Sequence, residues 1–210
     1  HCIRLTKSPF YGKPMTLMLW QKAFIEAVYS FKLADRTYIN AYGQEKHVDR
    51  FQKIVLLIGR KNAKSETCSG LELTESIVGN EGADLVCSSN DDVQASILYD
   101  AIDTMRLMID PQQEDTRKNQ RFIKILATNS KIFKLSDRTR NKEGRNIDFA
   151  VIDEVHEMKD NVILKSIEQS QSLKDNPKLI IITTEGFVND GALDEILRDC
   201  RRIINGEDDG

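Results

Sequence analysis

The chain has 210 residues, of which 40% are apolar and 30% charged, and a formal net charge of −3. These values are typical of a globular protein with one sizeable core, and they exclude fibrous and disordered classes. No apolar run approaches the roughly 20 residues that span a bilayer, so we expect no membrane partner. The four cysteines and three histidines lack metal-ligand spacing, and idle thiols in a reducing compartment are the simplest interpretation.

Helical and strand periodicities alternate along the chain. Residues 17–31 predict an amphipathic helix, whose expected buried face is Trp20, Phe24, Ala27, Val28 and Phe31. Buried strands are expected at 53–58, 148–152 and 179–182, another short strand at 84–88, and a hairpin of 121–127 and 131–135. Further helices are expected at 65–78, between the capping residues 89–91 and Pro111 with Val93, Ile97, Ala101, Met105 and Met108 on one stripe, at 161–172 and at 193–204. This order predicts an α/β fold with a mostly parallel central sheet flanked by helices.

Basic residues are concentrated in the segment 117–145, which has ten basic and two acidic side chains. The ten are Arg117, Lys118, Arg121, Lys124, Lys131, Lys134, Arg138, Arg140, Lys142 and Arg145. Such a band is either a solvated face or a contact for the phosphates of nucleic acid.

The segment between the strand expected at 53–58 and the helix expected at 65–78 has the composition of a phosphate-binding loop. It reads Gly59-Arg60-Lys61-Asn62-Ala63-Lys64-Ser65. Backbone N–H groups of such a loop and of the helix N-terminus face the phosphates, because their partial charges favour an anion. We expect Lys64 to reach the β- and γ-phosphates of ATP and the Ser65 hydroxyl to bind Mg²⁺.

This loop departs from the usual pattern at two positions. Glycine normally stands directly before the lysine and five residues earlier, where this chain has Ala63 and Ile58. A positive φ at Ala63 would carry a steric cost that glycine avoids. On the loop alone, a surface turn that contains Lys-Ser is the alternative.

The strand expected at 148–152 ends in two carboxylates, Asp153 and Glu154. Ligands bind at the carboxyl ends of strands in α/β sheets. We expect Asp153 to hold the water shell of Mg²⁺ and Glu154 to polarise the water that attacks the γ-phosphate. The alternative is that the two acids only stabilise the N-terminus of a following helix. The Lys-Ser loop upstream favours the nucleotide site over this alternative.

Two weaker signals complete the expected site. Thr183, Thr184 and Glu185 close the last buried strand, where hydroxyls are expected to sense the γ-phosphate or the attacking water, unless they form a plain strand exit. Trp20 and Gln21 are candidates for an apolar wall and an amide against adenine, although a tryptophan on a helical stripe is more often core.

Together these motifs resemble the ATPase domain of tailed-bacteriophage terminase large subunits. The resemblance covers nearly the whole chain in the right order, and the loop's departure from the common pattern is shared with that family. It rests on Leu17-x-x-Trp20-Gln21, Arg60-Lys61-Asn62-Ala63-Lys64-Ser65, Val151-Ile152-Asp153-Glu154-Val155-His156 and Ile182-Thr183-Thr184-Glu185-Gly186.

The resemblance implies a P-loop NTPase of the additional-strand, catalytic-glutamate, RecA-like type that uses ATP and Mg²⁺. It implies that Lys64 and Ser65 are the loop residues, that Asp153 and Glu154 are the acids, and that residues 183–185 couple hydrolysis to motion. The implied partners are double-stranded DNA, further copies of the chain in a ring, a small terminase subunit and a portal protein. The implied location is the cytoplasm of an infected bacterial host.

The resemblance also organises the chain as one ATPase domain, 1–210. Its expected parts are an N-terminal lead-in with the adenine-side helix (1–50), a P-loop core (51–186) and a C-terminal helix and tail (187–210). Because the chain begins without Met, we expect it to be cut from a longer protein. Family members carry a nuclease domain after the ATPase domain, and nuclease activity is expected to be absent from this fragment.

An arginine is expected to stabilise the charge that gathers on the γ-phosphate. Arg60 is the candidate within the same subunit, and the family places an arginine there. Arg138, Arg140, Lys142 and Arg145 are the candidates that would reach the nucleotide of an adjacent subunit, and their polar, glycine-containing segment otherwise keeps a loop soluble.

Two other functions remain open at this point. The sequence Asp153-Glu154-Val155-His156 is also that of a DExH helicase, but 210 residues leave no room for a second RecA-like domain. A degenerate P-loop module that binds nucleotide only for assembly is favoured by Ala63 and opposed by the intact Lys64, Ser65, Asp153 and Glu154.

Overall fold

The structure is a computed structural model that describes residues 2–40, 42–135, 146–184 and 191–207. The helices are α1 (Leu19–Ser30), α2 (Lys64–Val78), α3 (Asp92–Ile109), the short 3₁₀ helix η1 (Val155–Glu157), α4 (Val162–Gln171) and α5 (Ala192–Ile204). The strands are β1 (Lys32–Ile39), β2 (Glu45–Asp49), β3 (Lys53–Leu57), β4 (Asp84–Ser89), β5 (Thr116–Lys118), β6 (Phe122–Ile125), β7 (Lys131–Leu135), β8 (Ile147–Asp153) and β9 (Lys178–Thr183).

Seven strands form the central sheet, in the order β3-β9-β8-β4-β7-β6-β5. The strands β3, β9, β8, β4 and β7 run parallel to one another, and β6 and β5 extend the sheet beyond β7 in antiparallel fashion. Strands β8 and β9 are almost entirely buried, as expected for parallel strands that are covered on both faces. The predicted α/β architecture with a mostly parallel sheet is therefore confirmed.

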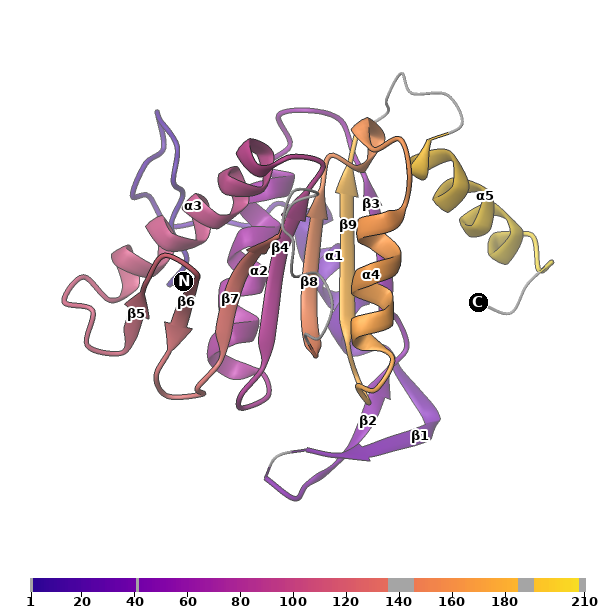
Figure 1. Cartoon of the computed structure of the whole chain (residues 1–210), viewed down its shortest axis with the longest axis horizontal. Coiled ribbons are helices and arrows are strands. Elements are labelled where there is room, and N and C mark those ends of the chain that lie inside the picture. The colour runs from indigo at the N-terminus through magenta and orange to yellow at the C-terminus, as the bar shows by residue number, and fades with distance from the viewer. Residues whose placement is uncertain (1, 41, 136–145, 185–190, 208–210) are drawn as a thin grey trace.

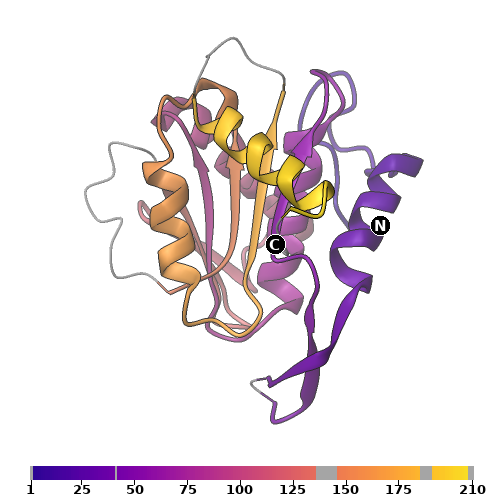
Figure 2. The same cartoon turned by 90° about the vertical axis from the view of Figure 1, so that its right-hand side faces the viewer.

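Helices cover the two faces of the sheet (Figures 1 and 2). On one face α2 and α3 pack against an apolar cluster that includes Leu85, Phe149 and Ile180. On the other face α4 and the start of α5 pack against a second cluster that includes Ile152 and Ile181. The result is a three-layered domain with an apolar core on each side of one sheet.

The register of the parallel strands brings several carboxyl ends to one edge of the sheet. Asp153, the last residue of β8, pairs with Ser89 of β4 and with Ile182 of β9. Leu57, the last residue of β3, pairs with Thr183. The segment 58–63, the first residues after β8 and the end of β9 are therefore neighbours.

Three expectations about packing were wrong. The run 53–58 was expected to be a buried strand, but β3 is the edge strand of the sheet and Leu57 is exposed. Val93 is 74% exposed, because the buried face of α3 runs through positions such as Leu98 and Ile102 instead. Phe31, expected on the buried face of α1, lies beyond the helix end and is 54% exposed.

The lead-in 1–50 contains a feature that the sequence analysis missed. Strands β1 and β2 form an antiparallel hairpin that projects below the lower ends of the sheet strands in Figure 1. Buried Asp49 at its base forms ion pairs with Lys32 and Lys178, and Asn176 donates to it at 2.8 Å. These contacts fasten the hairpin to the start of β9.

Candidate nucleotide-binding site

The loop between β3 and α2 is closed on itself by its own polar groups. Asn62 Nδ2 donates to the carbonyl oxygen of Gly59 at 3.0 Å. Lys61 and Ala63 have φ of 65° and 55°, so both occupy the left-handed region in which a non-glycine residue is strained. The steric cost expected at Ala63 therefore applies. Ala63 is the N-cap of α2, whose first residue is Lys64.

Helix α2 begins with its N-terminus directed at the loop. The Ala63 carbonyl accepts from the backbone N–H of Thr67 at 2.9 Å and from its hydroxyl at 2.8 Å. The N–H groups of a helix's first turn lack intrahelical partners and carry partial positive charge. This end of α2 is thus suited to hold an anion such as a phosphate.

Lys64 lies between the two acids that follow β8. Its Nζ donates to Asp153 Oδ1 at 3.0 Å and to Glu154 Oε1 at 2.6 Å. Burial acts to lower the pKa of Lys64, but the contacts with Glu154 and Asp153 outweigh it and hold the pKa above its ordinary value. The ammonium group is therefore charged at neutral pH.

Ser65 and Asp153 form the oxygen pair expected for a magnesium site. Ser65 Oγ donates to Asp153 Oδ2 at 2.7 Å, so a hydroxyl and a carboxylate meet at the start of α2. Mg²⁺ takes oxygen ligands and is usually bound by one or two protein groups together with waters and substrate phosphates. The two residues fit that role. Among the residues described, no group of three or more histidine, cysteine and acidic side chains forms an all-protein metal site.

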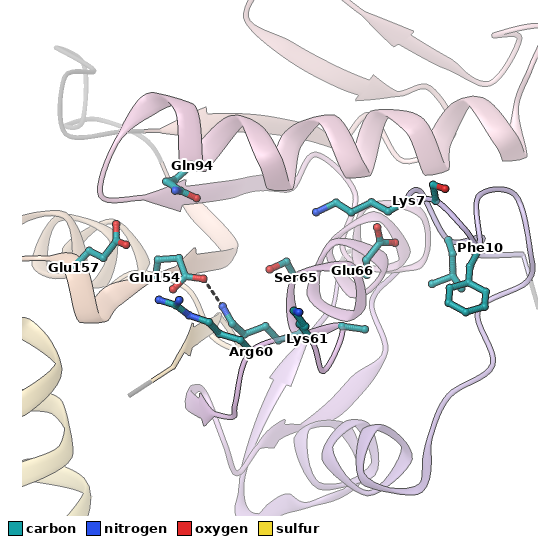
Figure 3. Close-up of a pocket in the computed structure, with 13 residues that line it drawn as sticks. Lys7, Phe10, Arg60, Lys61, Ser65, Glu66, Gln94, Glu154 and Glu157 are labelled. Atoms are coloured by element: carbon teal, nitrogen blue, oxygen red, sulfur yellow. Dashed lines mark hydrogen bonds and ion pairs between the residues drawn. The ribbon is translucent and has the colours of Figure 1, made fainter. Parts of the chain in front are cut away.

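A cavity of about 670 Å³ opens beside these residues (Figure 3). Its walls come from the loop and α2, from Gln94 of α3, from Glu154 and Glu157, and from the N-terminal segment. The N-terminal wall consists of Leu5, Lys7, Ser8 and Phe10. Figure 3 places Phe10 at one end of the cavity, and Arg60 extends toward Glu154 at the other. This size accommodates a nucleotide.

The N-terminal wall was not predicted, and no signal in its spacing would have shown it. Thr6 is held on α2 by Glu66, which accepts from both the backbone N–H and the hydroxyl of Thr6. This contact joins residues 60 positions apart, so only the tertiary structure brings Lys7 and Phe10 to the loop.

Trp20 and Gln21 do not line this cavity. The Gln21 amide is buried and engaged within the protein, because Nε2 donates to Thr67 Oγ1 and Oε1 accepts from the Met18 N–H, each at 2.7 Å. Their contact with adenine stays a prediction.

Thr183 and Thr184 are buried at the end of β9, beside the residues that follow β8. The Thr183 hydroxyl lies 3.1 Å from both the backbone nitrogen and Nδ1 of His156. Glu185 lies outside the described residues, as do Arg138, Arg140, Lys142 and Arg145.

The described part of the basic band divides between two faces of the sheet. Lys118 and Lys134 face α3 and pair with Asp103 and Asp92 of that helix at 2.7 and 2.9 Å. Three more, Arg117, Lys124 and Lys131, lie directly opposite one another across β5, β6 and β7 and so share the other face. The sixth, Arg121, is exposed and directly precedes β6.

The described helices include none that has both the length and the apolar character to cross a membrane.

Comparison with protein families matches residues 20–202 to the terminase large subunit, ATPase domain. Comparison with curated protein sequences gives no significant match.

Solved terminase structures share the fold. The large terminase of bacteriophage HK97 superposes with a TM-score of 0.74 at 24% identity, over 94% of this chain and 38% of that chain. The ATPase domain of the Thermus phage P74-26 large terminase gives 0.51 at 21% identity, over 65% of this chain and 61% of that chain. A large terminase from a thermophilic bacteriophage gives 0.51 at 12% identity, over 64% of this chain and 34% of that chain. The present chain thus spans less than two thirds of each relative. Since the family match extends over most of the chain, the protein belongs to the terminase large subunit ATPase domain family.

Proposed function

We propose that this ATPase domain hydrolyses ATP with Mg²⁺ and that the hydrolysis drives double-stranded DNA into a viral procapsid. The observation that carries the proposal is the placement of Lys64 Nζ between Asp153 and Glu154 at the N-terminus of α2. A cation, a hydroxyl and two carboxylates meet there beside a cavity of nucleotide size. We assign ATP hydrolysis, and no nuclease step, to residues 1–210.

Each group at the site has one role in this proposal. Lys64 holds the β- and γ-phosphates, while Ser65 and Asp153 provide the protein oxygens for Mg²⁺, which neutralises phosphate charge when bound. Glu154 takes the proton of the attacking water. Arg60, on the cavity wall, stabilises negative charge that develops on the γ-phosphate.

The remaining parts of the nucleotide site are assigned by position. The backbone of residues 59, 61, 62 and 63 cradles the phosphates. Leu5 and Phe10 offer an apolar wall for the adenine ring at the far end of the cavity, the role predicted for Trp20 and Gln21, which do not line this cavity. Thr183, Thr184 and Glu185 couple hydrolysis to motion at the end of β9.

Family membership supports a proposal for the assembly in which this domain acts. We propose a homo-oligomeric ring in the cytoplasm of an infected bacterial host, working with a small terminase subunit and a portal protein. DNA meets the face of β5–β7 that bears Arg117, Lys124 and Lys131, where three aligned cations match the spaced charges of a phosphate backbone. Figure 1 shows α4 over β8 and β9 and not over these strands.

Two substitutions test the ATPase proposal. Lys64→Ala should weaken ATP binding, because it removes the charge that faces the phosphates. Glu154→Gln should keep ATP binding and lower turnover by about 10²–10⁴-fold, because it removes the base and preserves the shape. Binding is measured with a fluorescent ATP analogue and turnover by phosphate release, with and without linear double-stranded DNA.

The control is Lys22→Ala, which removes an exposed lysine of α1 and should leave both quantities unchanged. Near-normal turnover in Glu154→Gln would refute the assigned base. Nucleotide binding by a parent chain that never releases phosphate, even with DNA, would instead support a nucleotide-binding assembly module.

A further inference from the structure

His156 has none of the roles assigned to the nucleotide site, although it is buried beside Glu154. It lies in η1 with 6% of its surface exposed. Its Nδ1 is 3.0 Å from Glu154 Oε2 and 3.1 Å from Thr183 Oγ1. One ring nitrogen thus faces the proposed base and the end of β9 at the same time.

The hydrogen bonds around Thr183 determine which nitrogen of His156 carries a proton. The Thr183 hydroxyl has one proton, which it donates to the Thr184 carbonyl oxygen at 3.1 Å. Its oxygen therefore accepts from the backbone N–H of His156 and from Nδ1. Glu154 Oε2, as a carboxylate oxygen, also only accepts. Both neighbours of Nδ1 are acceptors, so Nδ1 bears the proton.

The opposite tautomer would leave two lone pairs in contact. If Thr183 donated to Nδ1, the Nδ1 lone pair would lie 3.0 Å from a carboxylate oxygen of Glu154. A buried pair of acceptors without a proton between them is costly. The geometry therefore selects a ring with Nδ1–H shared between Glu154 and Thr183.

We propose that His156 is a positioning residue that holds the Glu154 carboxylate and the end of strand β9 in one hydrogen-bonded unit. Glu154 is gripped from both sides, because Lys64 donates to Oε1 and His156 donates to Oε2. When phosphates engage Lys64, the imidazole remains to fix the carboxylate. This inference rests on the proposed role of Glu154 as the base.

The end of β9 extends this unit to the phosphate loop. The Ile182 carbonyl accepts from the Glu154 N–H at 3.1 Å, and the Thr183 carbonyl accepts from the Ile58 N–H at 3.2 Å. His156 therefore ties the Glu154 side chain to Thr183, whose carbonyl also holds Ile58 at the start of the loop, while Ile182 holds the Glu154 backbone. A misplaced carboxylate at such a site loses rate rather than affinity.

The first test compares His156→Leu with His156→Asn, whose amide Nδ2 can donate from nearly the place of Nδ1. His156→Leu should lower kcat by about 10²-fold with little change in KM or in ATP affinity. His156→Asn should recover most of that loss. The matched control is His47→Leu, which removes an exposed histidine of the β1–β2 hairpin and should leave kcat unchanged.

Thr183 supplies a second arm. Thr183→Val removes the acceptor and should lower kcat, and Thr183→Ser, which restores a hydroxyl at the same place, should recover most of that loss. If the two side chains act as one unit, the combined His156→Leu and Thr183→Val variant should lose no more than the larger single loss. Independent, multiplying losses would contradict the unit.

The protonation of His156 Nδ1 can also be measured by NMR, without any turnover. The chain has three histidines, and the long-range ¹H–¹⁵N spectrum of His156 is assigned by its loss in His156→Asn. We expect Nδ1 to be protonated. An unprotonated Nδ1 overturns the proposal whatever the kinetics.

The kinetic outcomes separate this inference from the proposed function. If Glu154→Gln is inactive while His156→Leu is as active as the parent, only the role of His156 falls. If His156→Leu lowers Tm and ATP affinity as well as kcat, and His156→Asn does not restore kcat, His156 acts only in packing. That outcome also overturns the inference. An active Glu154→Gln removes the proposed base, and this inference with it.

Discussion

Two strained residues, Ala63 and Glu154, position Lys64 and its partner: Ala63 directly precedes Lys64 at the start of α2, and Glu154 accepts from the Lys64 ammonium group. Their φ values are 55° and 56°, and a non-glycine residue in the left-handed region costs about 1–2 kcal/mol. At Glu154 this conformation ends β8 and returns the carboxylate to within 2.6 Å of Lys64 Nζ. Strain of this kind persists where the surrounding contacts over-determine the geometry, as Ile182 and His156 do here.

Glu72 of α2 is the residue whose burial should cost most stability. Within the described part of the chain neither of its carboxyl oxygens has a hydrogen-bond partner, and burial raises its pKa well above the ordinary value. Glu72→Met, which removes a buried unpaired polar group and keeps the volume, should raise the free energy of unfolding by about 1–3 kcal/mol at pH 7. Urea titration of both proteins measures this.

The pH dependence of that gain follows from the direction of the pKa shift. Between the unfolded pKa, about 4.3, and the higher folded pKa, the unfolded chain has released a proton that the folded chain retains. The stability of the parent therefore falls as pH rises through this window, and the advantage of Glu72→Met should grow from pH 4 to pH 7. Exposed Glu26 of α1 provides the control, Glu26→Met, for which no such trend is expected. An advantage that is constant with pH would show that Glu72 is not held protonated.

Sequence reasoning placed Lys64, Ser65, Asp153 and Glu154 together, because a loop after one strand and acids after another meet at the carboxyl edge of a parallel sheet. It assigned no role at the site to Phe10 or His156, because their positions depend on contacts between distant segments. The roles of all these residues stay predictions.

At the scale of elements, the β1–β2 hairpin depends on a buried ion pair that no local pattern encodes. Asp49 and Lys178 are both almost fully buried and 129 positions apart. Burial acts to raise the pKa of Asp49, but contacts with Lys178, Lys32 and Asn176 outweigh it and lower the pKa. The pair therefore stabilises the protein above the ordinary aspartate pKa and loses its effect as pH falls below it.

Asp49→Asn should destabilise the protein by about 3 kcal/mol at pH 7, because it leaves a buried lysine without its counter-charge. The difference from the parent should shrink as the pH approaches 3. The control is Lys32→Gln, which removes the more exposed partner and should cost less than about 1 kcal/mol. Equal losses in the two variants, measured by thermal unfolding, would show that the burial of Lys178 does not depend on Asp49.

The antiparallel strands β5–β7 carry the DNA prediction. Replacing Arg117, Lys124 and Lys131 by Gln should weaken binding of double-stranded DNA at low salt and reduce the slope of log affinity against log salt by up to about 0.9 per lost contact. Lys118→Gln with Lys134→Gln is the control, because it removes cations that already pair with α3. Fluorescence anisotropy at several salt concentrations measures both. If the control loses as much DNA affinity per removed charge, the net charge of the protein determines binding, and this face of the sheet has no special part in it.

Most elements were predicted from the sequence because their periodicities are strong, as in α2 and β8. The sheet order was not, and this is why β3 was taken for a buried strand. An apolar run of five or six residues has the same pattern in a central strand and in an edge strand. That β3 is an edge strand is known only from the sheet order, in which β3 pairs with β9 alone. The hairpin was missed because β1, with its mostly exposed residues, lacks a clear alternation.

At the scale of the whole molecule, the site lies on an open edge of the sheet. Among the described residues the cavity is bounded by the loop, α3, η1 and the N-terminal segment, and none of them closes it completely. A ring of such domains can bring a neighbour's side chain to the γ-phosphate. Terminal phosphate transfer gathers negative charge there, and an arginine supplied to it raises the rate by about 10³–10⁵-fold.

We expect this domain to hydrolyse ATP poorly alone and to need a basic residue of a neighbour. The candidates are Arg138, Arg140, Lys142 and Arg145, which lie outside the described residues and just before β8 in the sequence. The test mixes Glu154→Gln with Arg138→Ala, and then with the alanine variant of each other candidate, under conditions in which the chain assembles. In a mixture, a subunit that has an intact Glu154 but lacks the basic residue lies next to a subunit that has the basic residue but lacks the base, Glu154. Phosphate release should therefore recover in the mixture although neither variant is active alone. If no candidate recovers activity, the charge on the γ-phosphate is met within the subunit, and Arg60, which reaches the same end of the cavity as Glu154, is the residue to replace next.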